Sequence, residues 1–235
     1  MEIDSPELTL PPAPTPVDVA RAAHTPGPGE PPLDCQVCPR LAAFRAESAA
    51  RNPGWWNAPV PGFGDPDAWL AIAGLAPGIQ GANRTGRPFT GDWAGILLFE
   101  TLAKFGLSRG TYAGRLDDGL ELDGVFITNA VRCVPPQNKP EPAEIHNCRG
   151  FHAERLKSLP NLKVVITLGT IAHQSTIKAI GGKLPKYPFA HNALHKLPSG
   201  LLILDSYHCS RLNTNTGRLT PEMFEAVFEQ ALTLR

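Results

Sequence analysis

Four cysteines are spaced in a way that suits metal binding. Cys35 and Cys38 form a C-x-x-C pair, and Cys133 and Cys148 follow far downstream with 14 residues between them. In a cytosolic chain, four cysteines favour a metal site over disulfides. A zinc ribbon has two tight pairs, whereas the second pair is wide, so a four-cysteine iron–sulfur cluster is at least as good an interpretation. A redox-active C-x-x-C pair and a set of small buried hydrophobic side chains are the alternatives.

Three polar runs each follow a short apolar segment. The run GLAPGIQGANRTGRPFTGD occupies 74–92, TNAVRCVPPQNKP occupies 128–140 and SYHCSRLNTNTGRLT occupies 206–220. The first run has neither the Walker order nor the dinucleotide-binding order of glycines, so it gives little support to a nucleotide site of either kind. Its backbone can approach a ligand closely, and Arg84 and Arg87 are available for phosphates or base edges.

Two residues of these runs have side chains suited to acid–base or electrostatic chemistry. His208 precedes Ser210 and Arg211 directly after a predicted buried strand, and this position favours a functional role over that of an ordinary core histidine. Asp92 stands immediately before a predicted helix. The first expectation for Asp92 is an N-cap that accepts backbone N–H bonds, and a catalytic carboxylate is the second.

Apolar strands that alternate with helices must position these groups. We predict buried strands over 69–73, 125–128, 164–168 and 201–204, and helices over 39–50, 93–105, 142–159 and 170–179 and from 220 onward. This alternation is typical of an α/β fold with a parallel sheet covered on both faces. Because ligands of open α/β sheets bind at the carboxyl ends of the strands, we expect the polar runs to meet at one edge.

Composition limits the class of protein. With 235 residues, of which 42% are hydrophobic, the chain is too apolar to be disordered and long enough for one sizeable domain. It contains no run of about 18 uncharged apolar residues, which excludes a membrane span. The first ten residues lack the features of a secretory signal, so we expect a cytoplasmic location.

The N-terminal segment differs from the rest of the chain. Residues 1–32 hold nine prolines and five acidic residues with Arg21 as the single base, so we predict a disordered extension. Residues 33–235 then form one domain with 21 basic and 17 acidic side chains. This excess of positive charge is compatible with a phosphate-bearing partner but does not require one.

Together, the three polar runs and the four cysteines resemble the family 5, or B-type, uracil-DNA glycosylases. The resemblance covers residues 33–235. It implies a three-layer αβα fold around a central four-stranded parallel sheet and a [4Fe–4S] cluster. It also implies a DNA repair enzyme that hydrolyses the N-glycosidic bond of damaged bases and leaves an abasic site.

The resemblance assigns roles to individual residues of this sequence. The implied cluster ligands are Cys35, Cys38, Cys133 and Cys148, and the implied catalytic residues are Asp92, Asn138 and His208. Leu75 and Ala76 stand where related families carry a residue that activates water, so that usual role is vacant. Phe89 is similar to the aromatic residue on which the extruded base stacks, and Asn129 occupies the place of a uracil-reading Asn in sister families.

Further contacts follow from the same resemblance. The implied substrate-binding residues are Gly74, Ala76, Gly78, Phe89, Asn129 and Ser210. The residues expected to contact DNA phosphates are Arg84, Arg87, Lys139, Arg211 and Arg218. The expected partner is double-stranded DNA containing damaged bases, bound by a monomer, and acceptance of single-stranded DNA is left open.

The bond to be broken dictates the expected mechanism. The base must first be flipped out of the stack, which costs least for a mispaired base. His208 would then donate a hydrogen bond to the departing base anion, while Asp92 would stabilise the sugar cation or position a water. We expect broad specificity for uracil, hypoxanthine and xanthine. No lysine stands in a clear Schiff-base setting, which favours a monofunctional enzyme.

Two other classes of function stay open. One is a noncatalytic nucleic-acid-binding module in which a metal site joins the N-terminal segment to the sheet, and it predicts binding indifferent to base damage. The other is an electron-transfer protein, and it predicts a cluster exposed enough to meet a partner.

Overall fold

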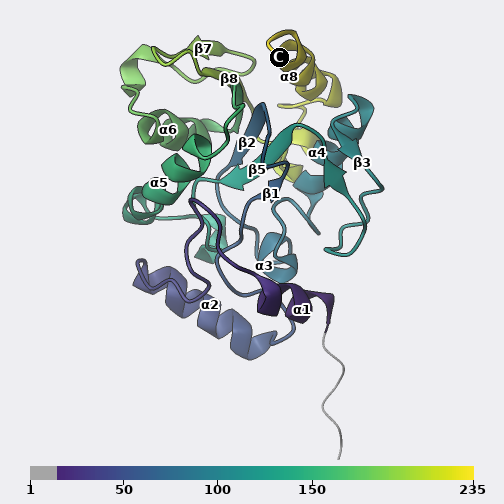
Figure 1. Ribbon diagram of the computed structural model, residues 1–235, viewed down its shortest axis with the longest axis vertical. Helices are drawn as coiled ribbons and strands as arrows, with labels where there is room; N and C mark the ends of the chain where they lie inside the picture. The colour runs from purple at the N-terminus through teal and green to yellow at the C-terminus, as the bar shows by residue number, and fades with distance from the viewer. Residues whose placement is uncertain (1–14) are drawn as a thin grey trace, which may run out of the picture.

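A six-stranded sheet forms the centre of the molecule. The structure is a computed structural model that describes residues 15–235 (Figure 1). Its strands are β1 (Phe63–Gly64), β2 (Leu70–Gly74), β5 (Val125–Asn129), β6 (Val164–Leu168), β7 (Leu194–Lys196) and β8 (Leu202–Ser206). They lie in the order β1-β5-β2-β6-β8-β7.

The four middle strands are parallel, as the alternation of strands and helices predicts. Neighbouring strands pair in register, with Gly74 opposite Asn129 at the carboxyl ends of β2 and β5. β1 and β7 add to the edges in antiparallel orientation. These edge strands have two and three residues. Because they are short and only partly buried, they leave no apolar run in the sequence and were not expected.

Helices cover both faces of the sheet. α4 (Trp93–Lys104) and α8 (Pro221–Thr233) lie on one face, and α5 (Pro142–Lys157) and α6 (Thr170–Ala179) lie on the other (Figure 1). The strands alternate accordingly, since Ile72 packs toward the α4 and α8 face and Ala71 toward the other. This arrangement confirms the three-layer αβα fold around four parallel strands.

Further elements lie outside this sheet and the four helices that cover it. They are α2 (Pro39–Arg51), α3 (Ala82–Thr85), α7 (Arg211–Asn215), a small hairpin of β3 (Ser108–Arg109) and β4 (Glu121–Leu122), and the 3-10 turns η1 (Pro136–Asn138) and η2 (Leu184–Lys186). No helix in the part of the chain from 15 onward combines the length and the apolar character that a bilayer crossing needs.

Residues 15–32 are ordered, which corrects the prediction of disorder for this part of the extension. Thr15 and Asp18 form a capping box for helix α1 (Pro16–Ala23), and the Arg21 guanidinium donates to the Trp55 carbonyl at 2.8 Å. The remaining residues of the predicted extension, 1–14, lie outside the described residues. The proline content suggested disorder, but Pro16 is the first residue of α1 and the later prolines lie in the ordered segment that follows this helix.

A buried ionic cluster explains how this segment is held. Glu30 accepts hydrogen bonds from the Arg155 guanidinium at 3.0 Å and from the Gly62 backbone N–H at 3.0 Å. Its other oxygen lies 3.5 Å from Nη1 of Arg132, which is fully buried. A buried guanidinium needs an opposite charge, so the N-terminal segment supplies a carboxylate that the core requires.

Candidate active site

Most of the predicted catalytic and substrate-binding residues meet in one pocket at the carboxyl edge of the sheet. The pocket has a volume of about 480 Å³ and extends between the glycine-rich run after β2, the start of α4 and the segment after β8. The predicted residues that line it are Ala76, Gly78, Phe89, Asp92, Asn129, Asn138, His208, Ser210 and Arg211. This volume suits a small ligand such as a nucleobase with part of its sugar.

Asn129 and Phe89 form the floor and one wall of this pocket. Asn129 is the last residue of β5 and is buried, and its Oδ1 has no hydrogen-bond partner among residues 15–235. The absence of a side chain at Gly74 is what lets the two residues meet. A Cβ at Gly74 would lie 2.7 Å from Cζ of Phe89 and would overlap Asn129 Oδ1. Gly74 therefore shapes the pocket without being one of its lining residues.

Asp92 is the N-cap residue that the sequence predicts, and it also lines the pocket. Its Oδ1 accepts the Gly95 backbone N–H at 3.1 Å and so caps α4. Its Oδ2 lies against the glycine-rich run, where a Cβ at Gly81 would be 2.5 Å from this oxygen. Burial raises the pKa of Asp92, although the Gly95 and Ala94 N–H groups oppose the rise. The carboxylate is thus held in position at the pocket with one oxygen directed away from the helix.

His208 also lines the pocket and lies on the segment that follows β8. Its ring is 6.0 Å from the Phe89 ring with an interplanar angle of 29°. The Nδ1 atom is buried and has no hydrogen-bond partner in the described part of the chain. Desolvation lowers the pKa of His208 to about 4, so the imidazole is neutral at pH 7. Ser210 caps the short helix α7, which fixes the direction of this segment.

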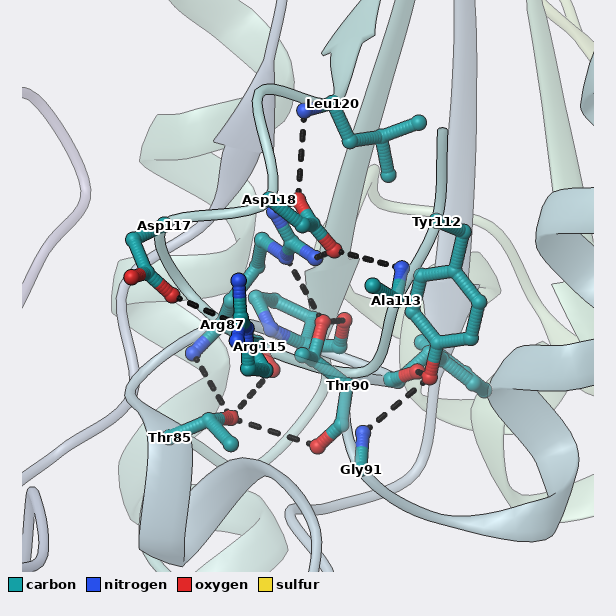
Figure 2. Close-up of polar contacts among 12 residues, drawn as sticks. Thr85, Arg87, Thr90, Gly91, Tyr112, Ala113, Arg115, Asp117, Asp118 and Leu120 are labelled. Atoms are coloured by element: carbon teal, nitrogen blue, oxygen red, sulfur yellow. Dashed lines mark hydrogen bonds and ion pairs between the residues drawn. The ribbon is translucent and has the colours of Figure 1, made fainter. Parts of the chain in front are cut away.

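The structure corrects the expectation that Arg87 contacts DNA. Arg87 is 2% exposed and makes a bidentate ion pair with Asp118, at 2.8 and 2.7 Å, as Figure 2 shows. The charges of Arg87 and Asp118 neutralise each other inside the protein, so the Arg87 guanidinium cannot reach a phosphate. Burial by itself would raise the pKa of Asp118. The hydrogen bonds from Arg87 and from two backbone N–H groups outweigh this effect and lower the pKa to about 2.

The other predicted DNA-contacting residues lie nearer the surface. Lys139, Arg211 and Arg218 are exposed, whereas Arg84 is half-buried and donates to the Gln80 carbonyl at 2.8 Å. Asn138 is exposed in the turn η1 and has a φ of 57°. Trp93 also lines the pocket, is 47% exposed and packs under the Arg211 guanidinium at 5.5 Å. Sequence reasoning missed Trp93, although it directly follows Asp92.

The four cysteines line a second, smaller cavity beneath α2. Cys38 occupies the N-cap position of this helix, Cys133 follows β5, Cys148 lies on α5, and Cys35 completes the set. Burial raises the pKa of the Cys133 thiol to about 12 and that of Cys148 to about 11. These thiols therefore ionise near neutral pH only if a cation binds to them.

Hydrogen-bond donors point at three of the four sulfur atoms. The donors are Arg45 Nη1 to Cys133 at 2.7 Å, the Arg132 backbone N–H to Cys148 at 3.4 Å and Asn147 Nδ2 to Cys38 at 3.7 Å. N–H groups directed at thiolates are a common feature of iron–sulfur sites. The donor set, four cysteines around one cavity, fits a four-cysteine cluster.

A separate buried group contains His173, His195 and Asp205. These residue types can bind a metal, and their ligand atoms lie within 4.8 Å of one another. However, Asp205 already accepts hydrogen bonds from Thr167 at 2.7 Å, His173 at 2.7 Å and His195 at 3.0 Å. Burial by itself would lower the pKa of His173, but the hydrogen bond to Asp205 outweighs this effect and raises it. This group is an internal charge network.

Comparison with known proteins identifies relatives over most of the chain. A sequence model described as the uracil DNA glycosylase superfamily matches residues 61–232. The chain is 47% identical over 205 residues to a type-5 uracil-DNA glycosylase of Thermus thermophilus, covering 85% of this chain and 93% of the relative. It is 39% identical over 203 residues to a type-5 enzyme of Pyrobaculum aerophilum, covering 85% and 88%. A type-4 uracil-DNA glycosylase of Sulfurisphaera tokodaii is 29% identical over 214 residues, covering 86% and 82%.

Proposed function

The chain belongs to the uracil-DNA glycosylase superfamily, and we propose that it excises uracil from DNA by hydrolysing the N-glycosidic bond. The observation that carries the proposal is the convergence of Phe89, Asp92, Asn129 and His208 on one pocket at the carboxyl edge of the sheet. This geometry and the relatives favour a glycosylase over a noncatalytic nucleic-acid-binding module or an electron-transfer protein.

Base recognition follows from the floor and wall of the pocket. A flipped base would stack on the Phe89 ring, which contributes favourably for any base because every base has a π face. Its polar edge would meet Asn129, whose buried Oδ1 has no partner among the described residues and is therefore available as an acceptor for a base N–H. This contact would favour uracil, which carries an N–H where cytosine carries a lone pair.

Bond cleavage separates charge, and the pocket offers a partner for each product. Negative charge develops on the departing base, to which the neutral His208 imidazole would donate a hydrogen bond. Positive charge develops on the sugar, which the Asp92 carboxylate would stabilise, or Asp92 would hold the attacking water. Leu75 and Ala76 offer no carboxylate at the start of the first run, so Asp92, at its end, carries this role alone.

The finer substrate range is part of the proposal. The same stacking wall and acceptor would admit hypoxanthine and xanthine, both of which arise by deamination. The exposed Lys139, Arg211 and Arg218 would contact phosphates of double-stranded DNA, with Arg84 at the margin. We propose that the enzyme acts as a monofunctional monomer in the cytoplasm.

An excision assay tests the proposal directly. An end-labelled duplex with one uracil opposite guanine is treated with the protein and then with alkali, beside an unmodified duplex. We expect alkali-dependent cutting at the uracil alone, and the same design then extends to hypoxanthine and xanthine. If the uracil duplex is not cut by protein that carries its full metal content, the uracil assignment is wrong.

We also propose that Cys35, Cys38, Cys133 and Cys148 hold a [4Fe–4S] cluster. The four sulfurs around one cavity and the N–H donors directed at three of them support it. When bound, the cluster supplies a structural crosslink between the start of α2, the end of β5 and α5. Cys38→Ala should therefore lower iron content, thermal stability and soluble yield. Unchanged iron content and stability would contradict the assignment.

A further inference from the structure

Phe89 forms a wall of the pocket in a backbone conformation that phenylalanine rarely adopts. Its φ is 54°, in the left-handed region, where the Cβ of a bulky residue is crowded. Such a conformation costs free energy and persists only where surrounding contacts hold it. The neighbouring residues must therefore contain the groups that fix the ring in the pocket.

The Tyr112 hydroxyl is one of these groups. It donates to the Phe89 carbonyl oxygen at 3.2 Å and accepts the Gly91 backbone N–H at 3.1 Å. The hydroxyl thus joins both sides of the turn that carries Phe89, as Figure 2 shows for Gly91. The Tyr112 ring is itself stacked on Phe99 of α4 at 4.5 Å between centroids. A group fixed in this way can hold the turn in one conformation.

Helix α4 also approaches the same carbonyl closely. A Cβ at Gly95 would overlap the Phe89 carbonyl oxygen, so only glycine allows the helix to pass this closely. The same Cβ would lie 2.7 Å from the Tyr112 hydroxyl, so the helix, this hydroxyl and the Phe89 carbonyl are packed closely together.

The Arg87 ion pair anchors the loop that carries Tyr112. Arg87 Nε donates to Thr90 Oγ1 at 2.7 Å, and the guanidinium binds Asp118, which also accepts the Ala113 backbone N–H at 3.0 Å. Loop 110–120 and the turn at 87–91 are thus joined at two points (Figure 2). None of Arg87, Tyr112 and Asp118 lines the pocket.

We propose that Tyr112 is a positioning residue that acts through Phe89, with the Arg87 and Asp118 pair as the anchor of its loop. Without the hydroxyl, the Phe89 carbonyl and the Gly91 N–H lose their partner, the turn relaxes, and the ring leaves the position in which it stacks on a base. The inference rests on the proposed function, because it concerns the geometry of the base pocket.

The substitution Tyr112→Phe removes only the hydroxyl. We expect the single-turnover rate of uracil excision to fall by about tenfold or more, because small misplacements of a binding wall are costly. The affinity for DNA should change by about threefold or less, since no exposed cation is altered. Tyr187→Phe is the matched control, because the Tyr187 hydroxyl makes no hydrogen bond within residues 15–235, and its rate should equal that of the wild type.

A double-mutant cycle separates positioning through Phe89 from a general loss of stability. In a Phe89→Ala background the wall is absent, so adding Tyr112→Phe should cost about twofold or less in rate. If Tyr112→Phe causes the same loss in both backgrounds, Tyr112 does not act through Phe89 and the inference is wrong.

Hydrogen exchange gives a readout that does not depend on excision. Tyr112→Phe should speed amide exchange in a peptide covering 87–92 and leave a peptide covering 97–104 of α4 unchanged. Unchanged exchange over 87–92 would overturn the inference. A wild-type protein that fails to excise uracil would instead contradict the proposed function, while the exchange result still decides whether Tyr112 holds the Phe89 turn.

Discussion

Asp92 uses its two carboxylate oxygens for different purposes. Oδ1 accepts the Gly95 N–H at the start of α4, while Oδ2 lies against the glycine-rich run at the pocket. Removing the side chain would therefore disturb the helix and, under the proposed mechanism, the reaction as well. A substitution that keeps a capping oxygen but removes the charge separates the two roles, since asparagine caps helices about as well as aspartate.

We predict that Asp92→Asn lowers the excision rate by about 100-fold or more, because the charge that stabilises the sugar cation is lost. Its thermal unfolding should match that of the wild type. Asp92→Ala should show the same loss of rate and, in addition, a loss of about 1 kcal/mol of stability from the missing cap. Single-turnover kinetics and thermal unfolding of both variants check this. Excision by Asp92→Asn at the wild-type rate would contradict the catalytic assignment.

The pH dependence of excision should have an acid limb set by Asp92. Burial raises the pKa of this carboxyl, so its charge is lost on acidification at a higher pH than for an exposed aspartate. His208 stays neutral down to about pH 4, so no change of rate should appear near pH 6.5, where an exposed histidine titrates. A rate profile from pH 4 to pH 9 checks both statements, and a clear inflection near pH 6.5 would contradict the second.

At the scale of an element, the segment 15–32 serves as a strap. It contributes Glu30, which lies 3.5 Å from the buried Arg132 and 3.0 Å from Arg155. Pro31 lines the cavity of the four cysteines, so the strap also closes that site. Removing the carboxylate leaves a fully buried guanidinium without its charge partner, which is among the most destabilising changes a core can undergo.

We predict that deletion of residues 1–14 leaves stability unchanged, whereas deletion of residues 1–32 strongly destabilises the protein. Glu30→Gln should lose about 3 kcal/mol, because Arg132 stays buried without a countercharge. Glu47→Gln removes an exposed carboxylate from a pair with Arg51 and should be neutral. Chemical denaturation of the four variants measures the differences. Equal stability of the two deletions would show that the strap does not support the core.

The sequence predicted some elements and missed others for physical reasons. The four central strands were predictable because each is a continuous apolar run between turn residues. Asp92 and His208 drew attention because Asp92 precedes a predicted helix and His208 follows a predicted strand, whereas the role expected for Asn129 came from the family resemblance. Arg87 was interpreted wrongly because its partner Asp118 lies 31 positions away, and Glu30 because its ionic partners, Arg132 and Arg155, lie beyond position 130. Contacts over such separations leave no local pattern, and Tyr112 was missed for the same reason.

At the scale of the whole molecule, the proposed binding of DNA at one edge of the sheet depends on exposed cations of a chain that has no net charge. The exposed Lys139 and Arg211 flank the pocket at the carboxyl ends of the strands. Lys163 lies at the opposite edge, immediately before β6 begins. On the proposed placement, DNA that delivers a base into the pocket passes Lys139 and Arg211 and does not reach Lys163. The three side chains therefore provide a test of where the duplex lies.

We predict that Lys139→Ala and Arg211→Ala each weaken binding to duplex DNA and reduce the slope of log affinity against log salt concentration by about 0.9, since each removes one phosphate contact. The loss should be the same for uracil-containing and undamaged duplexes, because a phosphate contact carries no information about the base. Lys163→Ala, with the same change of formal charge, should leave the slope unaltered. Fluorescence anisotropy over a series of salt concentrations measures all three. An equal reduction by Lys163→Ala would mean that the duplex is attracted by total charge and not by this edge, and the proposed placement of DNA would be wrong.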